Sequence, residues 1–434
     1  MTTYEIKGSA NYCAECIEAP AWEDMIQFPT LQNLRGIPWA GYTILVPRDY
    51  AGARLVVFPA ESQLSETVAH DLNLHAKAEL NADTTLSGYL ACNRRIKAIR
   101  LRGVPSNALA LPAEYFGSPA VGEVFDTVDG VPVSRKYVVP QKASNGTSGK
   151  RVERLWRRVE DKMLPMHYDT GQYWRESDKF ADDDMLVVTQ KLHGTSVRIA
   201  NTIVKRKLSW LERLLQRIGV RVQDTEFDVI GGSRKVIKDP TDLNQQHWYG
   251  SQDGEFNGDI WTHAAQRFGS VIPKNVILYG ELVGWLPDTS TPIQSGYTYR
   301  IPVGVYEFFV YRVAVVTEDG GLYDLSWDGV REFCAARGLN HVPELWRGRK
   351  SEFDPTHWTD QRFAEAASAA RLTGVELFRD IPLPLADESP VDEGIIALRE
   401  GVVPFALKVK SPVFLEAESR QMDNANEENG EVLE

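Results

Sequence analysis

Cysteine and long apolar runs are scarce in this sequence of 434 residues. Four cysteines occur, and only Cys13 and Cys16 have the spacing of zinc ligands. The chain has no second pair of this kind and no histidine before His70, so we expect free, reduced thiols rather than a closed zinc site. No apolar run approaches the roughly 20 residues of a membrane span, and the first residues lack the apolar core of a secretory signal. We therefore expect a cytoplasmic protein that does not enter a membrane.

Basic residues are fewer than acidic residues, so that the formal net charge is -12 and the sequence pI is about 5.3. Phosphate contacts dominate affinity for nucleic acids, so this total argues against such a partner. The charge is unevenly distributed along the chain, however. Residues 416–434 carry seven acids and one base, whereas residues 150–158 and 205–221 are basic. An acidic total therefore does not exclude a basic face.

The remaining composition, with 43% hydrophobic and 25% charged residues, is typical of a globular protein. A chain of this length is expected to form roughly two to three domains. Residues 143–149 are small, polar and rich in glycine, so we expect a linker and a domain boundary there. Apolar residues recur at helical spacing from Val152 to Val159, which predicts a basic helix that ends near residue 161.

The region before this linker contains short strand candidates separated by turns. Residues 42–46 and 55–59 are apolar and flank a turn, which predicts a hairpin. Residues 96–103 are another strand candidate, rich in cations. Small β-barrels of the OB type bind nucleic acid on such surfaces, and a solvated face on a half-buried strand is the alternative. The cations are Arg94, Arg95, Lys97, Arg100 and Arg102.

A second amphipathic segment lies between Leu208 and Ile218, with leucines along one stripe and Arg213 and Arg217 elsewhere. This pattern favours a helix that docks on the protein surface. Contact with a nucleic-acid backbone is the alternative.

Residues 191–196 combine a lysine that follows an apolar run with a glycine and two hydroxyl residues. A lysine at a strand end, beside a turn that can approach a phosphate, is a candidate nucleophile. Alone, the pattern is more often a solvated turn, so its meaning depends on residues further along the chain. Polar residues that could bind a phosphate or a metal ion follow, each in or beside an apolar run. Alternatively, these residues could cap strand ends or form a solvated strand edge. They are Arg234, Glu281, Glu393, Lys408 and Lys410, together with an aromatic strand at residues 305–313.

In this order, these residues resemble the motifs of the covalent nucleotidyltransferase superfamily of ATP-dependent polynucleotide ligases and capping enzymes. The resemblance covers residues 163–411. Its most specific parts are Lys191-Leu192-His193-Gly194, Tyr279-Gly280-Glu281, Glu393-Gly394-Ile395-Ile396 and Leu407-Lys408-Val409-Lys410. His193 stands where aspartate is commoner and is similar to the nick-sealing RNA ligase branch. Residues 58–65 and 95–103 resemble the OB module that precedes the catalytic domain of Deinococcus-type template-directed RNA ligases.

The resemblance implies ATP as the cofactor and Lys191 as the residue that carries covalent AMP. Lys191 must attack as a neutral amine, and nearby cations lower the pKa of a lysine electrostatically. Lys408 and Lys410 are suited to this role and to holding the phosphates as charge builds up. Glu281 and Glu393 match the positions that bind Mg²⁺ or Mn²⁺, or the water shell of the ion.

Further residues resemble nucleotide contacts of the superfamily. Tyr311 matches the aromatic residue that stacks on adenine, and period-2 geometry puts Phe309 on the same face of its strand. Arg234 resembles the arginine that contacts a phosphate of the nucleotide or of the RNA end. The expected nucleotide-binding set is completed by His193, Gly194 and Ser196.

Two positions depart from the family pattern. Ser196 stands where relatives use arginine or asparagine, and its short hydroxyl reaches less far, so Arg198 is a candidate to compensate. Leu398 and Arg399 follow Glu393 where relatives often have a lysine. Both departures concern the outer contacts of the nucleotide.

The sequence thus predicts an α+β protein with an ATP-grasp-like nucleotidyltransferase domain of antiparallel sheets with helices. The predicted order is an OB-like β-barrel at 1–142, a linker and basic helix at 143–162, the adenylyltransferase domain at 163–411 and an acidic disordered tail at 412–434. The predicted activity is ATP-dependent RNA ligation through lysyl-AMP, which joins a 5′-phosphate to a 3′-OH at nicks in a duplex, by a monomer. The alternatives are a DNA ligase, a capping-type guanylyltransferase, and a non-catalytic nucleic-acid-binding protein with a degenerate ligase fold.

Overall fold

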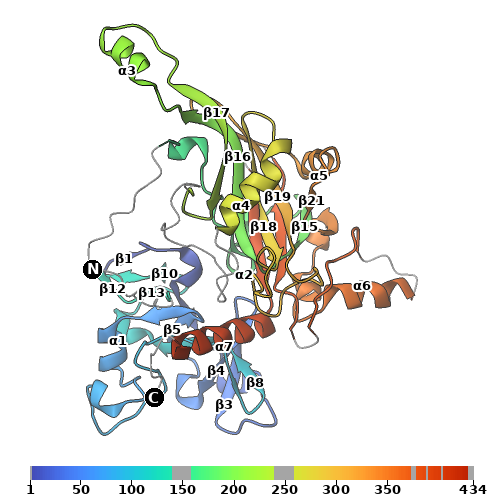
Figure 1. The fold of residues 1–434 in the computed structure, drawn as a ribbon. Coiled ribbons are helices and arrows are strands. Elements are labelled where there is room, and N and C mark those ends of the chain that lie inside the picture. Colours follow the sequence, from blue (N-terminus) through green and yellow to red (C-terminus); the bar gives the residue numbers. More distant parts are fainter. Residues whose placement is uncertain are drawn as a thin grey trace. The chain divides into compact units, whose positions relative to one another are not determined.

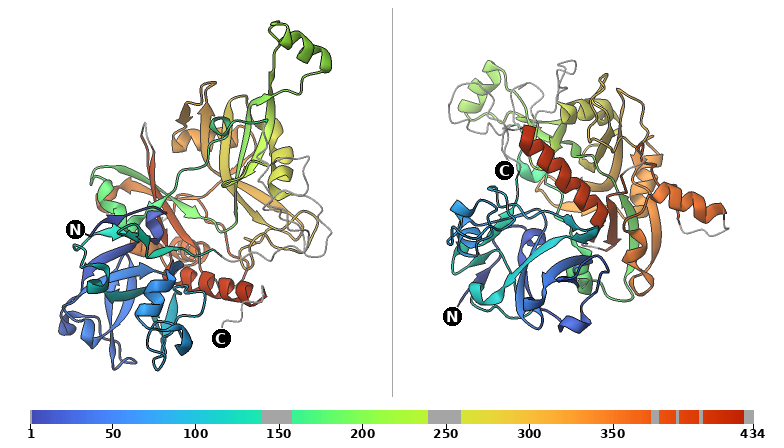
Figure 2. Two further views of the ribbon diagram at one scale, coloured as in Figure 1. Left: turned by 90° about the vertical axis from the view of Figure 1, so that its left-hand side faces the viewer. Right: turned by 90° about the horizontal axis from the view of Figure 1, so that it is seen from below.

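The computed structural model of the chain describes residues 2–138, 158–238, 259–372, 378–387, 390–401 and 404–428. Figures 1 and 2 show its helices and strands. The chain forms two compact units: unit 1 comprises Met1–Thr147, Gly171–Asp178 and Val409–Glu434, and unit 2 comprises Ser148–Thr170 and Lys179–Lys408. Within the described residues, no helix has both the length and the apolar character that crossing a membrane requires.

The strands of unit 1 are β1 (Tyr4–Glu5), β2 (Ala14–Glu18), β3 (Leu34–Trp39), β4 (Tyr42–Pro47), β5 (Arg54–Pro59), β6 (Ser62–Leu64), β7 (Ile99–Leu101), β8 (Val104–Ser106), β9 (Ala108–Pro112), β10 (Val124–Phe125), β11 (Thr127–Val128), β12 (Val131–Pro132), β13 (Ser134–Lys136) and β14 (Gly171–Gln172). Its helices are α1 (Glu66–Asp71), α2 (Tyr173–Glu176) and α7 (Pro412–Glu428). One sheet has the order β10-β2-β5-β9, another has the order β1-β11-β12, and β3-β4, β6-β13 and β7-β8 form pairs. Among the described residues these sheets do not close into one barrel, so the predicted OB-like β-barrel is not confirmed.

Strand β5 of unit 1 is buried on both faces. Val56 and Phe58 pack into one apolar cluster, whereas Val57 packs into another that includes Ile44 of β4. The hairpin predicted for the segments that form β4 and β5 is wrong, because β4 pairs with β3 while β2 and β9 occupy the two edges of β5. An unbroken apolar run is typical of a strand covered on both faces, and β4 packs on a face of β5 instead of its edge.

Helix α7 contradicts the prediction that residues 412–434 form a disordered tail. The Ser411 hydroxyl accepts a hydrogen bond from the backbone N–H of Phe414 and caps the helix. Phe414 is 1% exposed, so the helix also contributes to the apolar interior. The excess of acids predicted disorder because it leaves little to bury, but unit 1 supplies cations that pair with those acids. Residues 429–434 lie outside the described residues.

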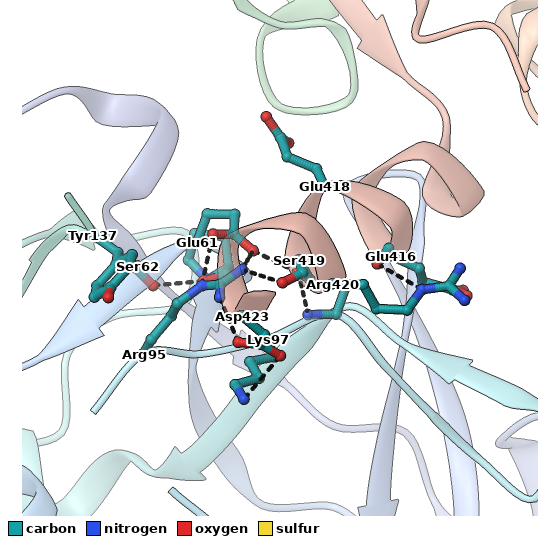
Figure 3. Close-up of polar contacts among 12 residues, drawn as sticks. Glu61, Ser62, Arg95, Lys97, Tyr137, Glu416, Glu418, Ser419, Arg420 and Asp423 are labelled. Atoms are coloured by element: carbon teal, nitrogen blue, oxygen red, sulfur yellow. Dashed lines mark hydrogen bonds and ion pairs between the residues drawn. The ribbon is translucent and has the colours of Figure 1, made fainter. Parts of the chain in front are cut away.

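The cation-rich segment of unit 1 provides these partners, as Figure 3 shows. Arg95 is 1% exposed and forms ion pairs with Glu61 and Asp423. Lys97 also pairs with Asp423, and Arg100 pairs with a further carboxylate of α7. A solvated face therefore does not describe Arg95, whereas the side chain of Arg100 is 46% exposed, and nucleic-acid binding by this segment stays a prediction.

The strands of unit 2 are β15 (Met185–Lys191), β16 (Thr195–Lys205), β17 (Thr225–Ser233), β18 (Val276–Gly284), β19 (Tyr306–Val316), β20 (Leu322–Asp324), β21 (Asn340–His341), β22 (Glu344–Arg349), β23 (Gly394–Arg399) and β24 (Phe405–Lys410), whose last two residues belong to unit 1. Its helices are α3 (Trp210–Arg217), α4 (Ile260–Phe268), α5 (Trp327–Ala335) and α6 (Phe363–Leu372). An antiparallel sheet has the order β17-β16-β18-β19-β20, and β21 pairs with β19 in parallel. In a second sheet, β24, β23, β15 and β22 are neighbours in that order. The predicted mixed fold of antiparallel sheets with helices is confirmed.

The lysine-containing hexamer joins the two sheets of unit 2. Strand β15 ends at Lys191, and a short turn leads into β16. Gly394 of β23 lies opposite Lys191, while Glu281 of β18 lies opposite Ser196. Strand pairing therefore brings acidic residues of two distant segments to the two ends of the hexamer.

The first sheet of unit 2 is covered on both faces. Helix α4 covers one face, where the rings of Phe268 and Phe308 lie 5.3 Å apart. The other face carries an apolar cluster that includes Ala200, Ile277 and Leu164. This second face also bears Glu281, because Ile277 and Glu281 are an even number of residues apart on β18.

Helix α3 lies at the tip of the ribbon formed by β16 and β17 (Figure 1). Ser209 and Glu212 form a capping box at its start. The predicted helix is confirmed, but its predicted docking is wrong: none of its residues is buried, and Trp210 is 71% exposed. The reason is that β18 pairs with β16 only as far as Asn201, so the ribbon extends past the sheet. Contact of α3 with a nucleic-acid backbone stays a prediction.

The predicted linker at residues 143–149 and most of the basic helix predicted after it lie outside the described residues. Asp161–Met163, at the expected end of that helix, forms a 3-10 turn. The predicted domain limits at residues 142 and 162 stay predictions.

Candidate active site

Lys191 and Glu393 form an ion pair where β15 and β23 meet. The Nζ atom of Lys191 lies 2.9 Å from Oε1 of Glu393, whose side chain is 3% exposed, and the Lys191 side chain is 25% exposed. Backbone pairing of β15 with β23 fixes both main chains. The candidate nucleophile is therefore held against a buried carboxylate, with part of its side chain open to solvent.

His193 belongs to the same cluster. Its Nδ1 atom lies 3.5 Å from Oε2 of Glu393, and its ring meets that of Tyr297 edge to face, with the centroids 4.8 Å apart. Its backbone N–H donates a hydrogen bond of 2.7 Å to the hydroxyl of Tyr299. The residue that distinguishes this motif is thus fixed through both its ring and its backbone.

Gly194 allows the turn to approach β18 closely. A Cβ atom at this position would lie 2.2 Å from the carbonyl oxygen of Leu282 and 3.0 Å from Cγ of Glu281. The side chain of Gln294 donates a hydrogen bond of 3.1 Å to the Gly194 carbonyl. Any larger residue at position 194 would push the lysine turn away from the strand that carries Glu281.

Glu281 is the second carboxylate of the site. Burial raises the pKa of Glu281 to about 8, against the opposing charge of Lys191 and with the added repulsion of Glu393. Arg234 also acts to lower this pKa, which places its positive charge within electrostatic reach. The charge of Lys191 thus offsets only part of the effect of burial on Glu281.

The donor set fits a hard divalent cation that also binds phosphate oxygens. Mg²⁺ characteristically uses one or two carboxylates, with water and phosphate completing its ligands, and Mn²⁺ accepts the same donors. Among the described residues, no group of three or more His, Cys, Asp or Glu side chains forms a metal site by itself. Cys13 and Cys16 are buried free thiols.

Tyr311 and Ser196 lie on the same side of the first sheet as Glu281. The Tyr311 hydroxyl and the Ser196 Oγ atom are 3.1 Å apart. The ring of His167 stands edge-on to Tyr311 with the centroids 5.0 Å apart, and burial lowers the pKa of His167 to about 3, so this imidazole is neutral. The aromatic and hydroxyl groups form a continuous wall beside the carboxylate.

A β-bulge modifies the predicted geometry of the aromatic strand. Glu281 lies opposite Phe309, but Tyr279 lies opposite Arg312, so Tyr311 is the extra residue. Phe309 is 8% exposed. Phe309 and Tyr311 both lie on the Glu281 side of the sheet, as predicted, and strict alternation along β19 fails only at Arg312, which follows the bulge.

Arg198 and Arg234 differ in their surroundings, because Arg198 is buried and Arg234 is exposed. Arg198 is 3% exposed and donates to the backbone carbonyls of Ser233 and Leu164, so the expectation that it compensates for Ser196 is wrong. These backbone contacts hold it inside the protein. Arg234 is exposed and ion-paired with Asp169.

The second departure from the family pattern, Arg399, also has a partner. Arg399 lies 3.3 Å from Asp184 and donates to the carbonyl of Lys179. Arg399 thus links β23 to the segment that precedes β15, and neither contact involves the lysine turn.

Lys408 and Lys410 lie on β24, which neighbours β23. Both are partly exposed and alternate with the buried residues Leu407 and Val409, as expected for two lysines on one face of a strand. Lys410 is ion-paired with Glu418 of α7 at 3.1 Å.

Sequence reasoning missed the residues that hold the lysine turn. Gln294, Tyr297 and Tyr299 come from the loop between β18 and β19, for which no element was predicted. Tyrosines two residues apart in a loop rich in proline and hydroxyl residues are a signal that could have drawn attention to it. Asp392 was also missed: burial raises its pKa to about 6, and Gln190 donates a hydrogen bond of 2.7 Å to it.

A lysine, two carboxylates and an aromatic residue on paired antiparallel strands define a candidate nucleotidyl-transfer site. A family model described as RNA ligase matches residues 184–410, which include all of these residues. The match spans more than half of the chain, so the chain belongs to the RNA ligase family.

Solved structures of similar fold include those of the Naegleria gruberi RNA ligase. A mutant of that enzyme in the apo form has a TM-score of 0.57 and 15% identity, over 94% of this chain and 98% of that chain. A mutant with ATP and Mn has a TM-score of 0.55 and 14% identity, over 95% of this chain and 99% of that chain. At these identities the likeness is one of fold. Among curated proteins, none matches this chain.

Proposed function

We propose that this RNA ligase is ATP-dependent and forms lysyl-AMP on Lys191. The observation that carries the proposal is the gathering of Lys191, Glu281 and Glu393 around one glycine-containing turn, with Tyr311 beside them. Structures of similar fold contain ATP or AMP together with Mn, which supports the choice of nucleotide and metal.

In the first step, the neutral amine of Lys191 attacks the α-phosphorus of ATP. A nitrogen–phosphorus bond forms as the nitrogen releases a proton to water, the bond to the bridging oxygen breaks, and pyrophosphate leaves. Glu393 orients the neutral amine by accepting a hydrogen bond from it, and Lys408 and Lys410 hold the phosphates as negative charge builds up.

Glu281 and Glu393 would hold Mg²⁺ or Mn²⁺, which when bound neutralises charge on the phosphates. The raised pKa of Glu281 means that it carries a proton for part of the time at neutral pH, and a cation bound there replaces that proton.

Tyr311 stacks on adenine in this proposal, and Phe309 supports the same side of the pocket. Ser196 and the Tyr311 hydroxyl contact each other, so the short serine contributes by orienting the ring rather than by reaching the nucleotide. His193 and Gly194 shape the turn that carries the lysine. Arg234, an exposed residue that directly follows β17, binds a phosphate of ATP or of the RNA end.

The later steps transfer AMP from Lys191 to a 5′-phosphate and then join the RNA ends. The 5′-phosphate oxygen attacks the lysine-bound phosphorus, the nitrogen–phosphorus bond breaks, and a pyrophosphate linkage forms. A 3′-OH then attacks the 5′-phosphorus and expels AMP. We propose that the ends lie at a nick in a duplex, that an OB-like module in the N-terminal strands grips this duplex, and that the enzyme acts as a monomer.

Labelling with α-radiolabelled ATP tests the first step. The wild-type protein with Mg²⁺ or Mn²⁺ should become covalently labelled, and Lys191→Ala should not. Label that survives the substitution would remove Lys191 as the nucleophile. Labelling by GTP in place of ATP would instead indicate a guanylyltransferase, and salt-dependent RNA binding with no label would indicate a non-catalytic protein.

Sealing of nicked duplexes tests the substrate. Duplexes that differ only in the sugar at the 3′-OH end should be sealed when that sugar is ribose. Equal sealing of a deoxyribose end would indicate a DNA ligase. Ring closure of single strands without a complementary strand would contradict the proposed role of the N-terminal strands.

A further inference from the structure

Lys410 is held by two side chains of the helix that follows it. Its Nζ atom lies 3.1 Å from Oε2 and 3.4 Å from Oε1 of Glu418. The same atom lies 5.0 Å from the centroid of the Phe414 ring. The side chains of Lys410 and Glu418 are 15% and 20% exposed, so partial burial strengthens this ion pair relative to one on an open surface.

The residues that hold Lys410 occupy one face of α7. Phe414 and Glu418 are four residues apart, which places them on the same face of a helix. Glu416, Ser419 and Asp423 lie on the opposite face, at spacings of three and four residues. Figure 3 shows Glu418 directed away from the contacts made by that opposite face.

The opposite face of α7 is fastened to the N-terminal strands by a buried network. Arg95 donates to Glu61 Oε2 at 2.9 Å, to Asp423 Oδ1 at 2.8 Å and to the Ser419 carbonyl at 3.0 Å. The Ser419 hydroxyl donates to Glu61. Glu61, Arg95 and Ser419 are 5%, 1% and 1% exposed. Breaking a buried ion pair leaves an uncompensated charge, so this network fixes the place of the helix.

Fixing Lys410 in advance has a consequence for catalysis. A lysine side chain has many rotamers, and restricting it costs conformational entropy when a ligand arrives. Glu418 and Phe414 restrict Lys410 beforehand, so less of that cost falls on the reaction. The benefit is largest where negative charge increases, which is in the transition state of nucleotidyl transfer.

We propose that Glu418 is a positioning residue for Lys410. The inference rests on the proposed function, because it takes Lys410 to act on the phosphates of ATP.

Single-turnover labelling of the full-length protein with α-radiolabelled ATP tests this role. Glu418→Gln should lower the maximal rate of lysyl-AMP formation about tenfold while the KM for ATP changes less than about twofold, since the loss falls on the transition state. Glu418→Asp should restore most of the rate. Glu416→Gln, which removes the same charge from the opposite face of α7, is the matched control and should stay within about twofold of the wild-type rate.

Four results would overturn the proposal. An equal loss in Glu418→Gln and Glu416→Gln, with a matching fall in Tm, would show that α7 is only structural. A faster Glu418→Gln would show that Glu418 withholds Lys410 from the phosphates. Normal labelling by Glu418→Gln alongside a loss in Lys410→Ala would remove the positioning role alone. Normal labelling by Lys410→Ala would instead remove the role of Lys410 in the proposed function, and the positioning role with it.

Discussion

Two glutamates of unit 2, Glu344 and Glu281, have opposite surroundings. Glu344, at the start of β22, is 0% exposed and forms ion pairs with Arg331 at 2.7 Å, Arg347 at 2.9 Å and Arg379 at 2.8 Å. Burial acts to raise its pKa, but hydrogen bonds from Arg347 and Arg331 hold the pKa of Glu344 below its ordinary value. Glu281 has a pKa raised to about 8 by burial, and Lys191 opposes this only in part because Glu393 adds negative charge.

The difference separates a structural carboxylate from one suited to binding. Glu344 has more positive partners than it has charges, so it needs nothing further to remain ionised. Lys191 offsets the burial of Glu281 only in part, and a divalent cation would supply further positive charge beside it. A buried carboxylate with a raised pKa beside a lysine is the pattern expected of a functional site.

Glu281→Gln is the change with the largest expected effect on activity. It keeps the shape of the side chain but removes the charge that holds the metal, so lysyl-AMP formation should fall about 10²- to 10³-fold. The Tm without metal should not fall, because an unfavourable charge is removed. A quench-flow labelling assay and a thermal melt measure the two quantities, and a large loss of Tm would make Glu281 structural.

Glu344→Gln should show the reverse pattern. The change leaves three arginines short of a partner, and the free energy of unfolding should fall by about 3–5 kcal/mol. Well below the Tm, the rate of lysyl-AMP formation should stay within a few-fold of that of the wild-type protein. Chemical denaturation measures the stability, and a catalytic loss comparable to that of Glu281→Gln would erase the contrast between the two glutamates.

The pH dependence of stability sharpens the comparison. An unfolded glutamate has a pKa of about 4.3, so between about pH 4.3 and pH 8 the folded protein keeps a proton on Glu281 that the unfolded chain has lost. The contribution of Glu281 to stability therefore falls as pH rises through this window and levels off above it. Without metal, the wild-type protein should lose about 3 kcal/mol more than Glu281→Gln between pH 5.5 and pH 8.5. Parallel curves for the two proteins would contradict the raised pKa.

Metal binding should have a related but smaller dependence on pH. Because Mn²⁺ replaces the proton on Glu281, its affinity should rise up to tenfold per pH unit below about pH 8, or about 1.4 kcal/mol per unit. The shift of the Tm with added Mn²⁺ measures this affinity. Glu281→Gln should bind Mn²⁺ weakly with little pH dependence, and a pH-independent affinity in the wild-type protein would show that Glu281 takes no part.

The strands that carry the site could be predicted from the sequence because their signals are local. Apolar runs predicted the strands that bear Glu281, Glu393 and Lys408, and the order of the polar residues indicated the family. Period-2 alternation could not reveal the bulge at Tyr311, because a bulge depends on how β19 pairs with β18. The loop with Tyr297 and Tyr299 gave no regular pattern for the same reason: its contacts are tertiary.

The N-terminal strands and α7 were predicted less well. Burial of β5 on both faces gave an apolar run that was mistaken for half of a hairpin. The cations around Arg95 and the acids of α7 are far apart in the sequence, so neither segment revealed that the other would neutralise it. Charge counts within one segment left a nucleic-acid surface and a solvated face as alternatives and predicted a disordered tail, whereas pairing between Arg95 and Asp423 gives a buried network.

Mass spectrometry of the protein after incubation with ATP and Mn²⁺ tests the central claim most directly. Our account predicts a single covalent adduct with the mass of AMP less one water, located by peptide mapping on Lys191 and absent from Lys191→Ala. An adduct on any other residue, or one that persists in Lys191→Ala, would contradict it.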